Sequence, residues 1–181
     1  MNRNISIENS MQLRKRILEI SQKVPALHIG GTFSSAEIIQ VLYDKKLKSK
    51  KDKFILSKGH AGILLYAILE QKGLISKKYL DSYCKKNGVY GVHPEVHQRG
   101  VEASTGSLGH GLAIAAGMSL AKKSRNIYVL ISDGELMEGS IWEAVLTISS
   151  FKLNNITLII DNNDLQSATR ASKTHPFSVS N

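Results

Sequence analysis

The chain has 181 residues, of which 42% are hydrophobic and 22% charged, so it can bury one sizeable core and is predicted to form a single domain over residues 1–181. Three prolines and 14 glycines without a strict period exclude collagen-like and linker-dominated classes. One cysteine excludes an internal disulfide. No apolar run reaches the ~20 residues that cross a bilayer, and the N-terminus has no apolar signal core, which predicts a cytoplasmic protein without a membrane partner.

The charge balance favours anionic ligands. The chain has 24 Lys and Arg residues and 15 acidic residues, which gives a net charge of +9. This charge would attract sugar phosphates, diphosphate cofactors, nucleic acids or an acidic partner chain. Six lysines crowd into one short segment: Lys45, Lys46, Lys48, Lys50, Lys51 and Lys53. This segment lacks the arginines and aromatic residues typical of nucleic-acid binders, so a solvated loop is the favoured interpretation and no nucleic-acid partner is expected. The nucleic-acid alternative rests on charge alone.

The N-terminal half is predicted to be mostly helical. Apolar residues recur at helical spacing in Ser10–Val24, which predicts an amphipathic surface helix that ends before Pro25. Further segments are predicted from their apolar runs and glycine content: a short strand at Phe54–Ser57, a buried helix at Ala61–Lys72, a helix at Ser76–Lys86, and a long loop at Tyr90–Gly111.

Ser34 and Glu37 have the spacing of a helix capping box. A turn-forming glycine pair at 30–31 precedes them, and Ser and Glu three residues apart can satisfy each other's backbone N–H groups at a helix start. The pattern predicts a helix that begins after Ser34 and reaches about Tyr43.

The second half contains the best-defined unit. Ile127–Ser132 and Ile156–Asp161 are near-continuous apolar strands, and Glu138–Phe151 between them is a helix predicted to turn one face inward with Ile141, Trp142, Val145 and Ile148. This spacing predicts a right-handed βαβ crossover. A helix rich in small residues, His110–Lys123, precedes it. The fold class is therefore α/β, with a parallel sheet covered by helices on both faces.

Hard oxygen donors follow both of these strands. Asp133 comes directly after the first, and Asn163 closely follows the second. If the strands are neighbours, ~4.8 Å apart, the two side chains can reach one ion. Carboxylate, amide and carbonyl oxygens suit Mg²⁺ or Ca²⁺, which could bridge to a diphosphate, and Gly134 lets the backbone approach that group. Each motif alone would be an ordinary turn or strand cap, whereas their joint placement favours a metal site.

Four blocks in order resemble the transketolase branch of the thiamine diphosphate enzymes. They are His28-Ile-Gly-Gly31; Leu56-Ser-Lys-Gly-His-Ala61; His93-Pro-Glu95 with Gly100–Gly111; and Ser132–Ala144 continuing to Ile159–Asn163. The similarity runs from about Ser10 to about Ser167, most of the chain. The resemblance implies a thiamine diphosphate-binding fold, namely the domain that binds the diphosphate of the cofactor. It also implies that this domain can be incomplete at its C-terminus.

The resemblance also implies roles for particular residues. Asp133, Asn163 and the carbonyl of Leu165 would hold Mg²⁺, with Ca²⁺ or Mn²⁺ as alternatives. The cofactor-binding set comprises the two metal ligands Asp133 and Asn163, His60 and Gly134 near the diphosphate, and Gly106, Ser107 and Leu108 on the other side of the cofactor. It also includes Glu138, which matches an acidic residue that supports communication between paired sites. The catalytic set is His28, His60 and His93, which would assist proton transfers. A lone histidine is usually structural, but three in three matched blocks favour function.

Full-length transketolases continue into a pyrimidine-binding domain, which carries an essential Glu, and a C-terminal domain. The resemblance therefore implies the N-terminal subunit of a split transketolase, which moves a two-carbon ketol unit from a ketose to an aldose, both sugars or sugar phosphates. The Glu would come from a C-terminal subunit, in a dimer or heterotetramer. A further substrate-site histidine of the family has no clear counterpart, and His175 is not assumed to replace it. The alternatives are a non-catalytic scaffold and a 2-oxo-acid dehydrogenase E1-type component, which would lack the histidine blocks.

Overall fold

The computed structural model describes residues 3–24, 27–47, 49, 51–167 and 169–174. Three parallel strands form the central sheet in the order β1 (Lys53–Leu56), β2 (Ile127–Ser132), β3 (Ile156–Asp161). The last rung of the β2–β3 ladder pairs Ser132 with Asp161. β2 is almost wholly buried, as expected of a central strand that carries helices on both faces. The predicted parallel βαβ unit is confirmed.

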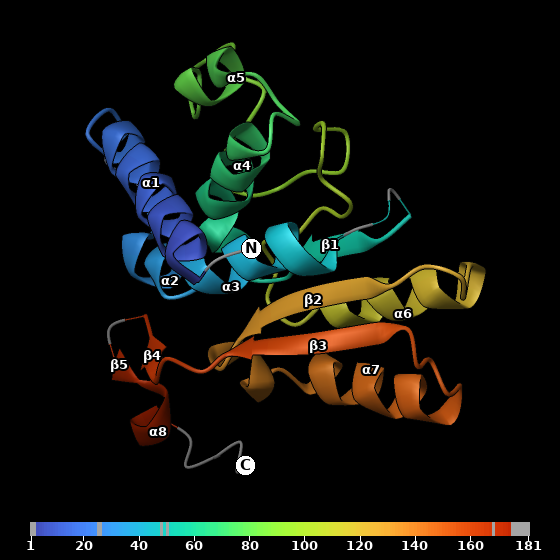
Figure 1. Ribbon diagram of the computed structural model, residues 1–181. Helices are drawn as coiled ribbons and strands as arrows, with labels where there is room; N and C mark the ends of the chain where they lie inside the picture. Colours follow the sequence, from blue (N-terminus) through green and yellow to red (C-terminus); the bar gives the residue numbers. More distant parts are fainter. Residues whose placement is uncertain (1–2, 25–26, 48, 50, 168, 175–181) are drawn as a thin grey trace.

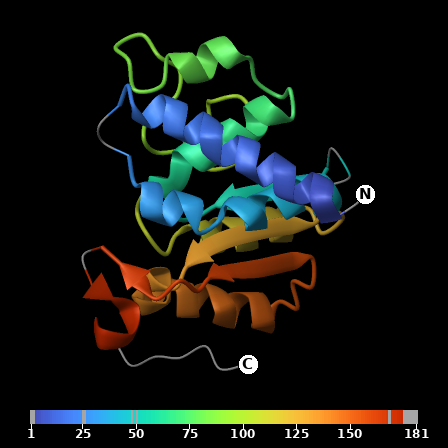
Figure 2. The ribbon, with the colours of Figure 1, turned by 60° about the vertical axis from the view of Figure 1, so that its left-hand side comes forward.

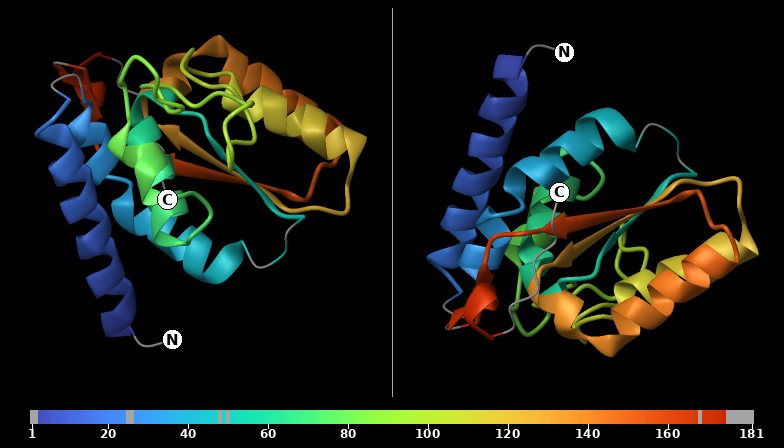
Figure 3. Two further views of the ribbon diagram at one scale, coloured as in Figure 1. Left: turned by 90° about the horizontal axis from the view of Figure 1, so that it is seen from above. Right: turned by 90° about the horizontal axis from the view of Figure 1, so that it is seen from below.

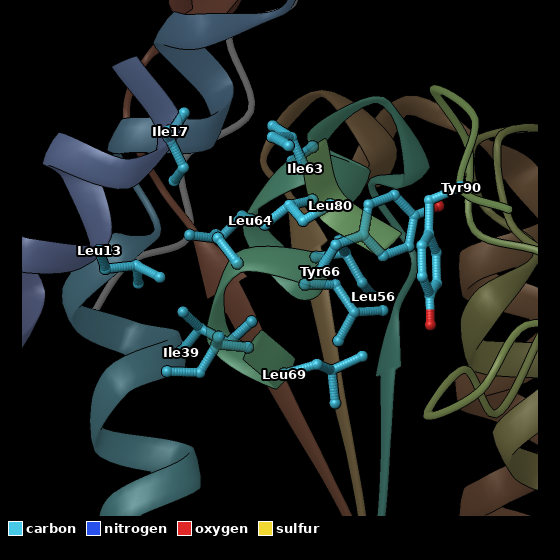
Figure 4. Close-up of a cluster of buried hydrophobic side chains, with 14 of the residues drawn as sticks. Leu13, Ile17, Ile39, Leu56, Ile63, Leu64, Tyr66, Leu69, Leu80 and Tyr90 are labelled. Carbon is cyan, nitrogen blue, oxygen red and sulfur yellow. The ribbon is translucent and has the colours of Figure 1, made fainter. Parts of the chain in front are cut away.

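One face of the sheet is covered by the N-terminal helices (Figure 1). They are α1 (Arg3–Ser21), α2 (Ile29–Phe33), α3 (Ala36–Val41) with its π-helical extension η1 (Leu42–Lys46), the 3-10 turn η2 (Gly59–Ala61), α4 (Gly62–Gln71) and α5 (Lys77–Asp81). Leu13 and Ile17 of α1 point toward Leu64 of α4 (Figure 4). This apolar cluster is closed from the sheet side by Leu56 and Leu130.

The other face carries α6 (Gly111–Ala121) and α7 (Gly139–Ser150), which pack side by side (Figure 3). A second apolar cluster lies between them and the sheet, built around Leu112, Ile131 and Ile141. The predicted α/β class with helices on both faces is confirmed. None of the described helices is long and apolar enough to pass through a bilayer.

Short elements gather beyond the strand ends. The 3-10 turn η3 (Gly134–Met137) follows β2, and β4 (Leu165–Gln166), β5 (Thr169–Arg170) and α8 (Ala171–Thr174) follow β3. Figure 2 shows β4, β5 and α8 beside the carboxyl ends of β2 and β3. The long loop predicted before α6 is confirmed, since residues 82–110 contain no helix or strand.

The predicted capping box is wrong. Ser34 is the C-cap residue that follows α2, and Ser35, the N-cap residue of α3, makes no side-chain cap. Both hydroxyls instead donate to Asp161 Oδ2, at 2.5 and 2.8 Å. Glu37 pairs with Arg14 of α1. The buried carboxylate at the end of β3 is a stronger acceptor than the local backbone, so it takes the hydroxyls that the local pattern assigned to a cap.

Two helix predictions need smaller corrections. The helix expected over Ser76–Lys86 is only the short α5, and turns follow Asp81. Trp142 is 44% exposed rather than part of the buried face of α7, which Ile141 and Ala144 provide. Its indole N–H donates to the carbonyl of Leu136, and this contact holds the ring at the end of the helix. The N-terminal helix begins earlier than predicted, at Arg3, and ends at Ser21.

Candidate functional site

A cavity of about 450 Å³ lies at the carboxyl edge of the sheet. It takes residues from the segments that follow all three strands, which is where parallel α/β sheets collect their ligands. The predicted site residues that line it are His28, His60, Gly106, Leu108, Gly134, Glu138, Asn163 and Leu165. Further lining residues, which the site prediction did not include, are Gly31, Lys58, Ser132, Met137, Gln166 and Ser167.

His28 and His60 lie together at one wall of this cavity. Their ring centroids are 5.5 Å apart in an edge-to-face arrangement. A Cβ at Gly31 would stand 3.1 Å from Nε2 of His60, so the glycine leaves room for the imidazole. Burial chiefly lowers the pKa of His60, and the positive charge of Lys58 lowers it further, to about 4. His60 is therefore a neutral imidazole near pH 7, able to accept or donate one proton.

His93 lines a neighbouring cavity of about 490 Å³. Gly106 lines both cavities, and Ser107 lines the one beside His93. Gly106 has a φ of 151°, and a Cβ there would stand 3.0 Å from the His93 ring. The three predicted histidines therefore occupy two adjoining cavities separated at Gly106.

Asp133 and Asn163 have their side-chain oxygens oriented by backbone N–H groups. Asp133 is 6% exposed, and its carboxylate accepts from the N–H of Gly134 at 2.9 Å and of Asp164 at 2.7 Å. Oδ1 of Asn163 accepts from the N–H of Leu165 at 2.8 Å, and its amide group donates to Ser34 Oγ at 3.1 Å. The loop after β3 thus contains Asn163 and, through the N–H of Asp164, also binds the carboxylate of Asp133, so it links the two predicted metal ligands.

These oxygens fit Mg²⁺ only together with a ligand. Among the described residues no group of three or more His, Cys, Asp or Glu side chains could hold a metal by itself. One carboxylate, one amide and one carbonyl leave the remaining positions of an octahedral shell open, and Mg²⁺ sites are commonly completed by phosphate oxygens and water. The donor set therefore suits a cation carried in with a diphosphate.

A buried ion pair beneath the cavity was missed by sequence reasoning. Nζ of Lys58 donates to Oδ2 of Asp161 at 2.6 Å and to Oγ of Ser35 at 3.1 Å. The lysine side chain is 1% exposed and that of the aspartate 5%. Burial alone would raise the pKa of Asp161, but the hydrogen bonds from Lys58 and Ser34 outweigh it and hold the pKa below its ordinary value. The sequence places Lys58 between an apolar strand and a Gly-His turn, but nothing in it indicates the distant partner Asp161.

Glu135 is the second residue that sequence reasoning missed. It is completely buried, and its carboxylate accepts from Ser57 Oγ at 2.5 Å, from the N–H of Gly109 at 2.9 Å and from the N–H of Ser132 at 2.9 Å. The carboxylate thereby connects the ends of β1 and β2 to the glycine-rich loop that forms the cavity wall. Glu135 supports the site from below, whereas Glu138 lines the cavity itself.

The remaining histidines differ in their surroundings. His110 lines the cavity beside His93, and His97 is an exposed loop residue 3.4 Å from Glu95. His175 lies outside the described residues. The fold and the cavity together define an α/β protein with a cavity at the carboxyl edge of a parallel sheet, lined by His28 and His60 and by Asn163 from the loop after β3.

The family is shown by comparison with known proteins. The model for the transketolase thiamine diphosphate binding domain matches residues 7–176, and the chain belongs to this family. It is 41% identical over 165 residues to an apulose-4-phosphate transketolase subunit from Phocaeicola vulgatus, across 84% of this chain and 59% of that protein. It is 34% identical over 167 residues to a 6-deoxy-6-sulfo-D-fructose transketolase subunit from a Clostridium strain, across 85% and 61%.

Solved structures agree with the sequence comparison. Transketolase from Leishmania mexicana superposes with a TM-score of 0.82 and 26% identity, over 92% of this chain and 30% of that chain. The R525L mutant of Pichia stipitis transketolase superposes with a TM-score of 0.83 and 25% identity, over 90% and 27%. The chain spans about three fifths of the length of the apulose-4-phosphate transketolase subunits that it matches.

Proposed function

We propose that the chain is the cofactor-binding subunit of a transketolase, which moves a two-carbon ketol unit from a ketose, such as a sugar phosphate, to an aldose. The observation that carries the proposal is the cavity in which His28 and His60 face the loop of Asn163 at the carboxyl edge of the sheet. The family membership supports the choice of thiamine diphosphate as its ligand. When bound, that cofactor supplies the carbon nucleophile and electron sink that allow a ketose to be cleaved beside its carbonyl.

The oriented oxygens would hold the metal and diphosphate end of the cofactor. Asp133, Asn163 and the carbonyl of Leu165 would bind Mg²⁺, while the backbone at Gly134 is free of a side chain that would exclude a phosphate. Gly106, Ser107 and Leu108 would line the opposite side. Glu138, which lines the cavity, would belong to the same binding set.

The histidines would serve the sugar. His60 is neutral near pH 7 because of its lowered pKa, so it can accept a hydrogen bond from a sugar hydroxyl or take up a proton from it. His28 stands beside it, and His93 lines the adjoining cavity through which a longer substrate would extend. Three imidazoles along one path can align a chain of hydroxyl groups and move protons between them.

We further propose that the chain acts with a second polypeptide. The matched relatives from Phocaeicola vulgatus and the Clostridium strain are each named as one subunit of a transketolase, which supports an assembly in which a partner supplies the pyrimidine-binding domain and its Glu. The assembly would be a dimer or heterotetramer in the cytoplasm. The single domain over residues 1–181 stays a prediction, supported by two apolar clusters that share one sheet.

Binding of the cofactor is the first test. Calorimetry of thiamine diphosphate with Mg²⁺ should show binding to the full chain with its partner and none to Asp133→Ala or Asn163→Ala, since each change removes an oxygen ligand. Asp52→Ala and Asn154→Ala are matched controls away from the cavity and should bind normally. Unchanged affinity in both site variants would remove the metal assignment.

Catalysis is the second test. The chain and its partner together should convert a ketose and an aldose to the exchanged pair, and the assay is repeated with pyruvate to detect 2-oxo-acid chemistry. Ketol transfer supports the proposal. Cofactor binding without any turnover in the assembled complex would instead identify the scaffold alternative.

A further inference from the structure

Lys58 is an unusual lysine because it is both buried and at the cavity. Its side chain is 1% exposed, although lysine is seldom fully buried unless it is paired. Its partners come from separate parts of the fold: Asp161 at the end of β3 and Ser35 at the start of α3. Such an arrangement fixes the ammonium group at one place and prevents it from turning toward solvent.

The ammonium group also lies close to His60. Both nitrogens converge on Gly31: the position of a Gly31 Cβ would be 3.7 Å from Nζ of Lys58 and 3.1 Å from Nε2 of His60. A positive charge so near disfavours a second positive charge on the imidazole, in a place where burial already disfavours it.

The other charged and titratable groups around His60 are few. His28 of the segment before α2 and His93 of the long loop act in the same direction as Lys58, and Asp161 acts in the opposite direction with a smaller effect. Glu138 is a further titratable residue that lines the cavity. His28 and His93 are exposed, whereas Lys58 is buried and held in its ion pair with Asp161.

We propose that Lys58, fixed by Asp161 and Ser35, is a positioning residue that keeps His60 neutral and in place at the cavity wall. It acts through its charge on the imidazole and needs no contact with the substrate. Asp161 has the complementary part, because it balances the lysine charge and makes its burial possible. The pair therefore lets a cation sit beneath a proton-transfer group without being exposed to solvent.

The proposal is tested by titrating His60 in the full chain by NMR, with isotope-labelled histidine and assignment by His60→Gln. In the wild type His60 should stay neutral down to about pH 5. Lys58→Met removes the charge at similar side-chain length and should raise the pKa of His60 by about one unit or more. Lys58→Arg keeps the charge and should leave the pKa within a few tenths of the wild-type value. An unchanged pKa in Lys58→Met would overturn the proposal.

A second variant keeps the test valid if Lys58→Met does not fold. Lys58→Met combined with Asp161→Asn removes both charges and leaves no unpaired carboxylate. The pKa of His60 should still rise, because the effect of Lys58 exceeds that of Asp161. A purely structural lysine predicts lower stability in these variants with His60 titrating as in the wild type, and that result would also overturn the proposal.

The catalytic consequence rests on the proposed ketol transfer. In the assembled enzyme, Lys58→Met should add an acidic limb to the pH profile of kcat/KM between about pH 5 and 6.5, whereas Lys58→Arg should not. Failure of the transketolase proposal would leave the NMR titration intact, since that measurement needs neither cofactor nor substrate. Failure of the titration would leave ketol transfer itself untouched.

Discussion

His60 and His97 are the same residue type in opposite surroundings. The side chain of His97 is 69% exposed, and its only described ionic neighbour is Glu95. His60 lies against Gly31 and His28, beside the buried charge of Lys58. The difference arises from what packs around each ring, and it couples the protonation of His60 to folding.

That coupling predicts a pH dependence of stability. Burial first, and then Lys58, lower the pKa of His60 from 6.5 to about 4 in the folded chain. Between these pH values the unfolded chain binds more protons than the folded one, so the free energy of unfolding falls as the pH is lowered. In His60→Gln this contribution is absent, and urea denaturation from about pH 4 to 7.5 should show a shallower decline than in the wild type. Identical pH slopes in the two proteins would contradict the assignment.

Glu135 is predicted to be needed for stability. In Glu135→Gln an amide N–H₂ group replaces one of two accepting oxygens, so at least one of the buried donors from Gly109, Ser132 and Ser57 is left without an acceptor. The free energy of unfolding should fall by about 1–3 kcal/mol, measured by urea denaturation. Glu143→Gln, on the exposed side of α7, is the control and should change it by less than about 0.5 kcal/mol. Equal midpoints for both variants would show that Glu135 is not the support described.

At the scale of elements, β2, α7 and β3 could be predicted closely because their signals are local. β2 is a buried apolar run, as in a covered parallel sheet, β3 is an apolar run of mostly half-buried residues, and the buried Ile141 and Ala144 of α7 have helical spacing. The start of α3 could not be predicted, because the partner of Ser34 and Ser35 is Asp161, far along the chain. A capping box is predicted from residues close in sequence. The prediction fails where a carboxylate distant in sequence is the better acceptor for the serine hydroxyl.

The residues of the candidate site also divide into those that could be predicted from the sequence and those that could not. Its histidines, glycines and strand-end oxygens could be predicted from residue type, order and spacing. Lys58 and Glu135 could not, because charged residues are ordinarily assigned to solvent, and only the assembled fold shows that both are buried against specific partners.

Replacing either of two glycines of α6 by alanine is predicted to change stability in opposite directions. A Cβ at Gly111 would stand 2.5 Å from Cβ and Oγ of Ser57, whereas a Cβ at Gly117 would meet nothing within 4 Å. Gly111→Ala should therefore destabilise the protein by forcing α6 away from β1. Gly117→Ala should stabilise it by about 1 kcal/mol, since alanine favours the helix. Thermal melting of both variants checks the signs, and a stabilised Gly111→Ala would refute the close packing.

At the scale of the whole molecule, one sheet joins two cores. Leu130 and Ile131 are neighbours in β2, yet the first belongs to the cluster beneath α1 and α4 and the second to the cluster beneath α6 and α7. Because side chains alternate along a strand, β2 contributes to both layers at once. Disturbing one core therefore changes the strand on which the other depends.

This arrangement predicts one cooperative unfolding transition seen by two separate probes. Trp142 lies on α7, on one side of the sheet, and the packed rings of Tyr66, Tyr83 and Tyr90 lie on the other. Tryptophan fluorescence and near-ultraviolet tyrosine dichroism should give the same denaturation midpoint, as two-state behaviour requires. Ile131→Ala should shift both midpoints together. Separate midpoints would mean that the two layers unfold independently.

The pairing of Ser132 with Asp161 also favours the correct register of β3 against β2. If β3 slipped by one residue against β2, every side chain of β3 would turn to the opposite layer, and Asp161 would no longer reach Lys58. A buried ammonium without its partner costs about 3–5 kcal/mol, which is a preference of a hundredfold or more for the aligned pairing. The ion pair of Lys58 and Asp161 thus destabilises other registers of β3. In the favoured register, the ends of β2 and β3 that carry Asp133 and Asn163 lie side by side.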